Sequence, residues 1–219
     1  MTIVAVWQEE DALWAVADTR TTRPMGAGPV ITSDMASKLF ALPIVCRPVP
    51  NEKTGLFPEP YFARAIGFAF AGSLAAALQT FATSTVFLQN LMSVEPHESP
   101  SLSDIAAFVA RVGEKFSSSL LFATKESDGR FDAAIFGWDD TVNKYRIFHL
   151  RPCITATKFR LDVFEFPTTE VLRFGTGSEE FDARLAKFKA REHQWRTVQS
   201  RQADHRASAN TDRLEAGEH

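Results

Sequence analysis

The stretch from residue 1 to residue 22, MTIVAVWQEEDALWAVADTRTT, decides how we interpret the rest of the chain. Two short apolar runs, Ile3–Trp7 and Ala12–Ala17, flank the polar residues Gln8–Asp11. Strand-forming residues on both sides of a short polar break predict a β-hairpin. The second strand ends at the charged sequence Asp18–Arg20.

Thr2 gives this hairpin a chemical interest, because only Met1 precedes it. Removal of an initiator methionine before a small residue would leave a threonine with a free α-amino group. A free α-amino group titrates near about 7.7–8.0, so that a usable fraction is neutral at physiological pH. The amine and the hydroxyl of one residue can then act as base and nucleophile.

Composition limits the classes of protein that fit. The chain has 219 residues, of which 45% are hydrophobic and 23% are charged, as expected for one globular domain. A formal net charge of -3 offers no basic field for nucleic acid, and no apolar run is long enough for a signal peptide or a membrane span. Cys46 and Cys153 lie far apart without metal-ligand spacing. We therefore predict a reducing, cytoplasmic location and no metal or other cofactor.

The first half of the chain alternates strands with breaks. Proline and glycine predict a loop over residues 23–29, and residues 30–33 and 37–42 are short strand predictions. Five prolines over residues 43–60 predict a long surface loop. Residues 65–71 read as a buried strand.

Helices and then further strands follow. Helical periodicity predicts helices over residues 74–92 and from Ser101 or Ser103 to residue 116, and a third that begins at Ser178. Strands are predicted at residues 119–123, 131–138, 144–150, 159–166 and 171–174. This order fits two antiparallel sheets with outer helices, an α+β layered domain over residues 1–190. Residues 191–219 are polar and are predicted to be a disordered or truncated tail.

Five short motifs occur in a characteristic order: Thr2, Ala17–Thr22 (ADTRTT), Ser37–Leu39 (SKL), Phe70–Ser73 (FAGS) and Gly175–Ser178 (GTGS). In this order they resemble the motifs of proteasome β-type subunits and bacterial proteasome-like peptidases, which are N-terminal-nucleophile hydrolases. The resemblance implies a four-layer αββα sandwich and a threonine-type endopeptidase. It also implies a self-compartmentalising homo-oligomeric ring that takes peptide or unfolded protein, fed by an ATPase unfoldase cap.

The resemblance assigns catalytic roles to individual residues. Thr2 would be nucleophile and, through its amine, base, while the Lys38 cation would disfavour protonation of that amine and stabilise the alkoxide. Asp18 would hold Lys38, and Arg20 would brace the same corner. The N–H group of Gly72 would stabilise the oxyanion, and the Thr176 hydroxyl would bond near the amine.

Substrate-binding positions follow from the same resemblance. They are Thr21, Ala36, Phe40, Phe70 and Leu74. Ala36 and Phe40 share a strand face with Lys38 by the two-residue period, which is consistent with this placement. An apolar lining predicts a hydrophobic residue before the scissile bond.

One part of the sequence departs from the family pattern. After Arg191 there is neither a second amphipathic helix nor a terminal apolar strand. Two alternatives therefore stay open: a catalytically inactive proteasome-like scaffold subunit, and an amidase of the wider class that acts on a small amide. The histidines have no metal or triad partner nearby in sequence, and we interpret them, including His149 within a strand, as solvated or structural.

Overall fold

The computed structural model describes residues 2–25, 28–50, 55–56, 58–94, 98–124, 129–154 and 159–177, and residues 181, 183, 184, 186 and 187. The chain divides into two compact units, Met1–Gly177 and Ser178–His219. All the strands and the two long helices described below belong to the first unit. In the second unit the described residues are helical, within the predicted third helix, whereas residues 191–219 lie outside the described part.

The larger sheet contains six strands: β5 (Leu39–Pro48), β6 (Phe62–Gly72), β7 (Leu91–Ser93), β8 (Phe131–Asp139), β9 (Lys144–Ile154) and β10 (Phe159–Phe166). Their spatial order is β10, β9, β8, β6, β5, β7. Neighbours are antiparallel except for β5 and β7, which are parallel. Strands β6 and β8–β10 agree with the sequence prediction. β7 was missed because the predicted helix over residues 74–92 covered its first two residues, whereas α1 ends at Leu88.

β5 corrects the prediction of a loop from residue 43 onward. The strand continues through Pro43, which pairs with Ala65 of β6. On its other side β5 meets β7 only from Cys46 to Pro48. Pro43 therefore faces an unpaired edge, where a residue without an N–H group loses no ladder hydrogen bond.

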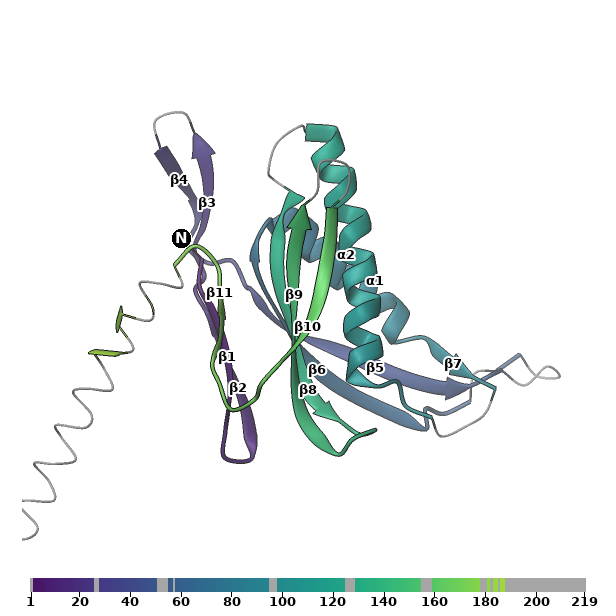
Figure 1. The fold of residues 1–219 in the computed structure, drawn as a ribbon. Coiled ribbons are helices and arrows are strands. Elements are labelled where there is room, and N and C mark those ends of the chain that lie inside the picture. Colours follow the sequence, from purple (N-terminus) through teal and green to yellow (C-terminus); the bar gives the residue numbers. More distant parts are fainter. Residues whose placement is uncertain are drawn as a thin grey trace, which may run out of the picture. The chain divides into compact units, whose positions relative to one another are not determined.

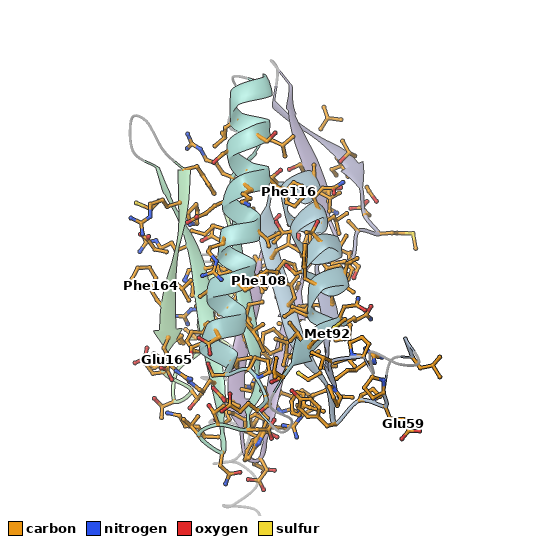
Figure 2. All side chains as sticks on the ribbon, turned by 90° about the vertical axis from the view of Figure 1, so that its right-hand side faces the viewer. Glu59, Met92, Phe108, Phe116, Phe164 and Glu165 are labelled. Atoms are coloured by element: carbon orange, nitrogen blue, oxygen red, sulfur yellow. The ribbon has the colours of Figure 1, made fainter. Side chains whose placement is uncertain are left out.

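Two helices, α1 (Leu74–Leu88) and α2 (Leu102–Thr124), cover one face of the six-stranded sheet (Figures 1 and 2). Ser73 caps α1 by accepting a hydrogen bond from the Ala76 N–H group. The predicted strand at residues 119–123 is wrong, because these residues continue α2. Leu120 and Leu121 prolong the helical face that packs on the core, and a short apolar run does not distinguish a strand from a buried helix.

A smaller sheet lies against the other face of the six-stranded sheet (Figure 1). It consists of β1 (Val4–Glu9), β2 (Ala12–Ala17) and β11 (Leu172–Phe174), in the order β11, β1, β2. Val4 and Val6 of β1 pack with Leu172 and Phe174 of β11 and with small residues of β6 and β8. This second core joins the two ends of the first unit.

A two-stranded ribbon follows β2 in the chain: β3 (Thr21–Met25) and β4 (Gly28–Ser33). The prediction of a loop at residues 23–29 is thus wrong for the residues that the structure describes. Pro24 and Pro29 are register partners in this ribbon. Each strand of a two-stranded ribbon has an open edge that tolerates proline.

The predicted α+β class is confirmed for the described residues, in which α1 with α2, the six-stranded sheet and the three-stranded sheet form three successive layers. The six-stranded sheet is not wholly antiparallel as predicted, because β5 and β7 run parallel. The fourth layer of the predicted αββα sandwich stays a prediction. Within the part of the chain that the structure describes, no helix is long and apolar enough to cross a bilayer.

A buried carboxylate joins α2 to the sheet. The side chain of Asp139, at the end of β8, is completely buried and accepts hydrogen bonds from the Leu102 N–H group, from Thr141 and from Arg146. Arg146 also forms an ion pair with Glu165 of β10. Burial alone would raise the pKa of Asp139, but the hydrogen bonds from Thr141, Arg146 and Leu102 together lower it below its ordinary value.

We predict that Asp139→Asn lowers the free energy of unfolding by about 3 kcal/mol, because one partner of a buried pair is lost. A lowered folded-state pKa stabilises the protein above the unfolded value of 3.8, and this stabilisation is lost as the pH falls through the folded pKa. Urea unfolding at about pH 5 and about pH 2.5 should therefore show a smaller acid loss in the variant than in the wild type. Asp140→Asn, which breaks a more exposed pair with Arg64, is the control. Equal acid losses in D139N and wild type would contradict the prediction.

Candidate active site

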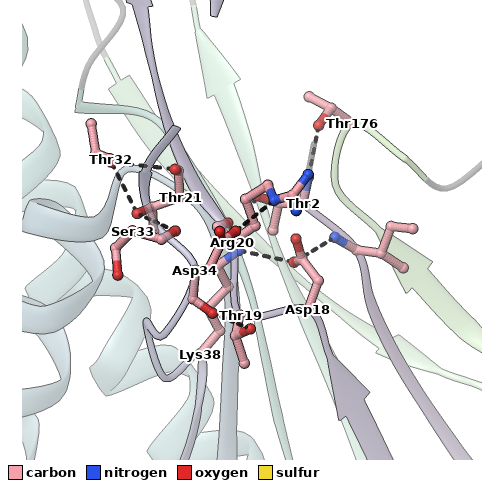
Figure 3. Close-up of polar contacts among 11 residues, drawn as sticks. Thr2, Asp18, Thr19, Arg20, Thr21, Thr32, Ser33, Asp34, Lys38 and Thr176 are labelled. Atoms are coloured by element: carbon pink, nitrogen blue, oxygen red, sulfur yellow. Dashed lines mark hydrogen bonds and ion pairs between the residues drawn. The ribbon is translucent and has the colours of Figure 1, made fainter. Parts of the chain in front are cut away.

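Thr2 lies where the first and last strands of the unit meet. Its main-chain nitrogen donates a hydrogen bond to Thr176 Oγ1 at 3.0 Å (Figure 3). Its carbonyl oxygen accepts a hydrogen bond from the Gly177 N–H group at 3.2 Å. The turn that follows β11, Gly175–Gly177, thus holds both sides of Thr2 through the Thr176 hydroxyl and the Gly177 N–H group.

Asp18 follows β2 directly and faces the start of β1. Its Oδ1 atom accepts hydrogen bonds from the Ile3 N–H group at 3.0 Å and from Lys38 Nζ at 2.9 Å. Its own N–H group donates to the Ile3 carbonyl at 3.1 Å. The carboxylate therefore positions the lysine and, at the same time, the residue after Thr2.

Lys38 directly precedes β5, and only 3% of its side chain is exposed. Its Nζ atom donates to Asp18 Oδ1, to the Arg20 carbonyl and, at 3.2 Å, to Thr2 Oγ1. An ammonium group has three N–H donors and no acceptor, so that these three oxygens satisfy it. Because Lys38 donates to the Thr2 hydroxyl oxygen, the hydroxyl hydrogen remains available to a base.

Arg20 contributes to the site through its backbone. The side chain forms an exposed ion pair with Asp34 at 2.7 Å, and its carbonyl oxygen accepts from Lys38. Thr19 reinforces this loop, since its hydroxyl donates to the Asp34 carbonyl at 2.6 Å and its carbonyl accepts from Ala36. Thr19 lies within the quoted ADTRTT motif, but no role was predicted for it. Asp34 was not predicted, because its only signal was a polar run between two strands, which is common in loops.

Gly72 and Gly175 allow the strand ends to approach. Gly72 ends β6 with φ +106°, and Gly175 follows β11 with φ +103°, a backbone region that favours glycine. A Cβ atom on Gly175 would lie 2.3 Å from the Thr2 carbonyl oxygen and 3.3 Å from Ala71 Cβ. Gly175 therefore lies against both the Thr2 carbonyl group and Ala71, the residue before Gly72 in β6. Gly175 belonged to a quoted motif, but its steric role was not foreseen.

The five predicted substrate-binding residues lie in different settings. Phe70 is 1% exposed, and its ring stacks on Phe40 with 6.2 Å between ring centroids. Leu74, at the start of α1, packs against the same core. Thr21 is bonded to Thr32 across the β3–β4 ribbon, and the Ala36 N–H group donates to Thr19. Phe70 thus belongs to the core, whereas Thr21 bonds to Thr32 (Figure 3) and Ala36 bonds to the Thr19 carbonyl.

Among the described residues there is no group of three or more histidine, cysteine, aspartate or glutamate side chains that could hold a metal ion. The chemistry that the Thr2 corner itself can offer is a hydroxyl nucleophile beside a fixed cation.

The arrangement of the layers around this corner is also found in solved structures of other proteins. Two solved structures share this fold. One is Anbu (ancestral beta-subunit) from Yersinia bercovieri, with 14% identity and a TM-score of 0.50. The other is the helical assembly of the Anbu complex from Pseudomonas aeruginosa, with 18% identity and a TM-score of 0.50.

In each case the match covers 81% of this chain and 61% of the Anbu chain. No protein-family model and no curated protein matches this chain. The predicted resemblance to proteasome β-type subunits is therefore wrong at the level of the family, because Anbu proteins are proteasome-like but distinct. The short motifs around Thr2 indicate the fold and the residues that lie near Thr2. They do not distinguish one proteasome-like family from another.

We predict that Gly175→Ala displaces Thr2, because the added Cβ atom meets a main-chain oxygen that cannot give way. The variant should lose about 2 kcal/mol or more of unfolding free energy, from backbone strain and from the clash. Gly55→Ala is a matched control, since Gly55 also has a positive φ (+65°) but nothing within 4 Å of the added atom. Thermal unfolding of both variants separates strain from contact, and equal losses would refute the steric role of Gly175.

Proposed function

We propose that this chain is a threonine-type endopeptidase that hydrolyses peptide bonds through Thr2 after Met1 has been removed. One observation supports this function above all others: Lys38 Nζ lies 3.2 Å from Thr2 Oγ1 while the Thr2 nitrogen lies 3.0 Å from Thr176 Oγ1. A nucleophile, a cation beside it and an acceptor for the nitrogen therefore surround one residue.

The first chemical step is acylation. The Thr2 hydroxyl oxygen attacks the carbonyl carbon of the scissile bond, and the hydroxyl proton passes to the Thr2 α-amine directly or through one water. Lys38 stabilises the developing negative charge on Oγ1, and the Thr176 hydroxyl orients the amine. The protonated amine then donates its proton to the departing amino group, which leaves an ester on Thr2.

The second step is hydrolysis of that ester by water, with the α-amine as base again. In both steps the negative oxygen of the tetrahedral intermediate would accept a hydrogen bond from the Gly72 N–H group. The positive φ of Gly72 and the proximity of β6 to Thr2 support this role. Asp18 acts by holding Lys38, and Arg20 acts through its carbonyl oxygen.

The inactive scaffold subunit is not favoured by these contacts. The third hydrogen bond of the buried Lys38 ammonium goes to a hydroxyl group that could act as a nucleophile. Here the hydroxyl, the nitrogen and the carbonyl group of Thr2 all have partners. The small-amide amidase has no comparable observation in its favour.

Assembly is part of the same proposal. One of the Anbu structures is a helical assembly, and this supports self-association of the present chain. We propose a homo-oligomer, closed into a ring, that takes peptide or unfolded-protein substrate from an ATPase unfoldase. The chain would act without a cofactor and in the cytoplasm, where the free Cys46 and Cys153 would stay reduced.

A fourth layer completes the proposed architecture. Trp14 and Val16 on the outward face of β2 are 53% and 45% exposed, and a second helical layer on that face would give an αββα sandwich. We place the boundary of this domain at residue 190 and regard residues 191–219 as a separate tail.

We predict that the mature protein lacks Met1, as intact mass would show, and that Thr2→Ala abolishes peptide cleavage. Lys38→Met should lower kcat about 10²–10³-fold, because the cation at the developing charge is lost. Arg64→Gln, which changes only a surface pair with Asp140, is the control for handling and stability. Retained Met1 in an active preparation, or cleavage by T2A at the wild-type rate, would rule out the Thr2 mechanism.

Substrate preference gives a further prediction. Ala36, Phe40 and Leu74 offer no charge, so that fluorogenic peptides ending in Leu or Tyr should be cut about 10-fold faster than those ending in Arg or Glu. The ratio of kcat/KM values measures this. An Ala36→Asp variant should shift the ratio toward Arg. A wild-type preference for Arg or Glu would exclude an apolar first subsite.

A further inference from the structure

A histidine–aspartate pair lies in the layer between the two sheets. His149 Nε2 of β9 is 3.2 Å from Asp132 Oδ1 of β8, and the side chains are 15% and 30% exposed. Ala134, the cross-strand partner of His149, and Ile147, two residues before it, belong to the core between the sheets. A charged or polar pair in such apolar surroundings needs to be held by its own contacts.

The His149 ring contacts the strand that leads to Thr176. It stacks on Phe174 with 5.1 Å between centroids and 24° between planes. Phe174 is the last residue of β11, and the next three residues are the turn Gly175–Gly177 that bonds both sides of Thr2. The position of Phe174 therefore determines where the turn starts, and with it the position of the Thr176 hydroxyl group.

Two other described elements support the turn, β11 and β6. β11 has three residues, and its only sheet partner among the described strands is β1. Gly175 also approaches Ala71 of β6, and Ala71 is the cross-strand partner of Asp132. Asp132 thus lies beside Ala71, which contacts the turn, and it bonds to His149, which packs on Phe174.

We infer that Asp132 and His149 are positioning residues for the Thr176 turn. The Asp132 carboxylate accepts a hydrogen bond from the Nε2–H group and fixes the rotation of the ring. The fixed ring then sets the position of Phe174. An aliphatic residue at position 149 would fill the same volume without a directed bond, and its rotation would not be set. This role rests on the proposed function, in which Thr176 orients the Thr2 amine.

The test uses a readout that needs no peptidase activity: hydrogen exchange at the Gly177 amide, which donates to the Thr2 carbonyl. In His149→Leu this amide should exchange about 10-fold faster than in the wild type. His149→Phe keeps a stacked ring, and Asp132→Asn keeps a neutral acceptor, so that each should give about a 3-fold increase. The amides of Ala36 and Phe70, bonded to Thr19 and Lys38, are the internal references and should not change.

Kinetics supply the second readout. Loss of positioning should lower kcat about 10-fold in H149L with KM within about 2-fold of the wild type, because substrate binding does not involve the turn. Asp140→Asn is the control variant. Unchanged Gly177 exchange in H149L, or an equal rise at the reference amides, would overturn the inference, and H149F decides it if H149L does not fold. A wild type that cleaves no peptide would defeat the proposed function, while Gly177 exchange would still decide the positioning role.

Discussion

The buried ammonium group of Lys38 is the constraint on which the Thr2 corner depends. Removing an ammonium from water costs several kcal/mol unless oxygens replace the lost hydration. Here the oxygens come from Asp18 after β2, from the Arg20 carbonyl before β3 and from Thr2 before β1. Two chain segments, the one before β1 and the link between β2 and β3, must therefore converge on Lys38, directly before β5. The contacts that satisfy the buried charge also place a cation beside a hydroxyl group. The same hydrogen bonds therefore stabilise the fold and create the arrangement on which the proposed chemistry depends.

The sequence predicted elements well where one periodicity ran without competition, as in β1, β2, β6, α1 and the β8–β9 hairpin. It failed where local composition and tertiary pairing disagreed. Pro43 suggested a loop, but the edge that β7 leaves open accommodates it within β5. Leu120 and Leu121 suggested a strand, although the core that α2 contacts extends to them. In each case the deciding partner is distant in sequence, and no local pattern contains it.

In the candidate site, too, local motifs contain some of the residues, whereas other contacts depend on partners that are distant in sequence. Asp18, Lys38 and Thr176 belong to the quoted motifs, and their side chains contact Thr2 or one another. A motif can record such residues, because the contacts depend on the side chain. Arg20 was expected to brace the corner, and its contribution turns out to be a carbonyl oxygen that any residue would supply. The steric role of Gly175 and the contact of His149 with Phe174 depend on how the sheets stack. Motifs alone also did not distinguish Anbu-like structures from proteasome β-type subunits.

The bond between Thr2 and Thr176 joins residues 174 positions apart. Pairing at such a separation is slow and late in folding, because the intervening chain must lose its freedom before the contact forms. During synthesis the first residue of the corner leaves the ribosome long before the turn at Gly175–Gly177 exists. The Thr2 corner is therefore incomplete until nearly the whole first unit has been made. A nascent or broken chain carries Thr2 without the partners that the folded unit gives it, so the contacts of this corner form only in the nearly complete unit.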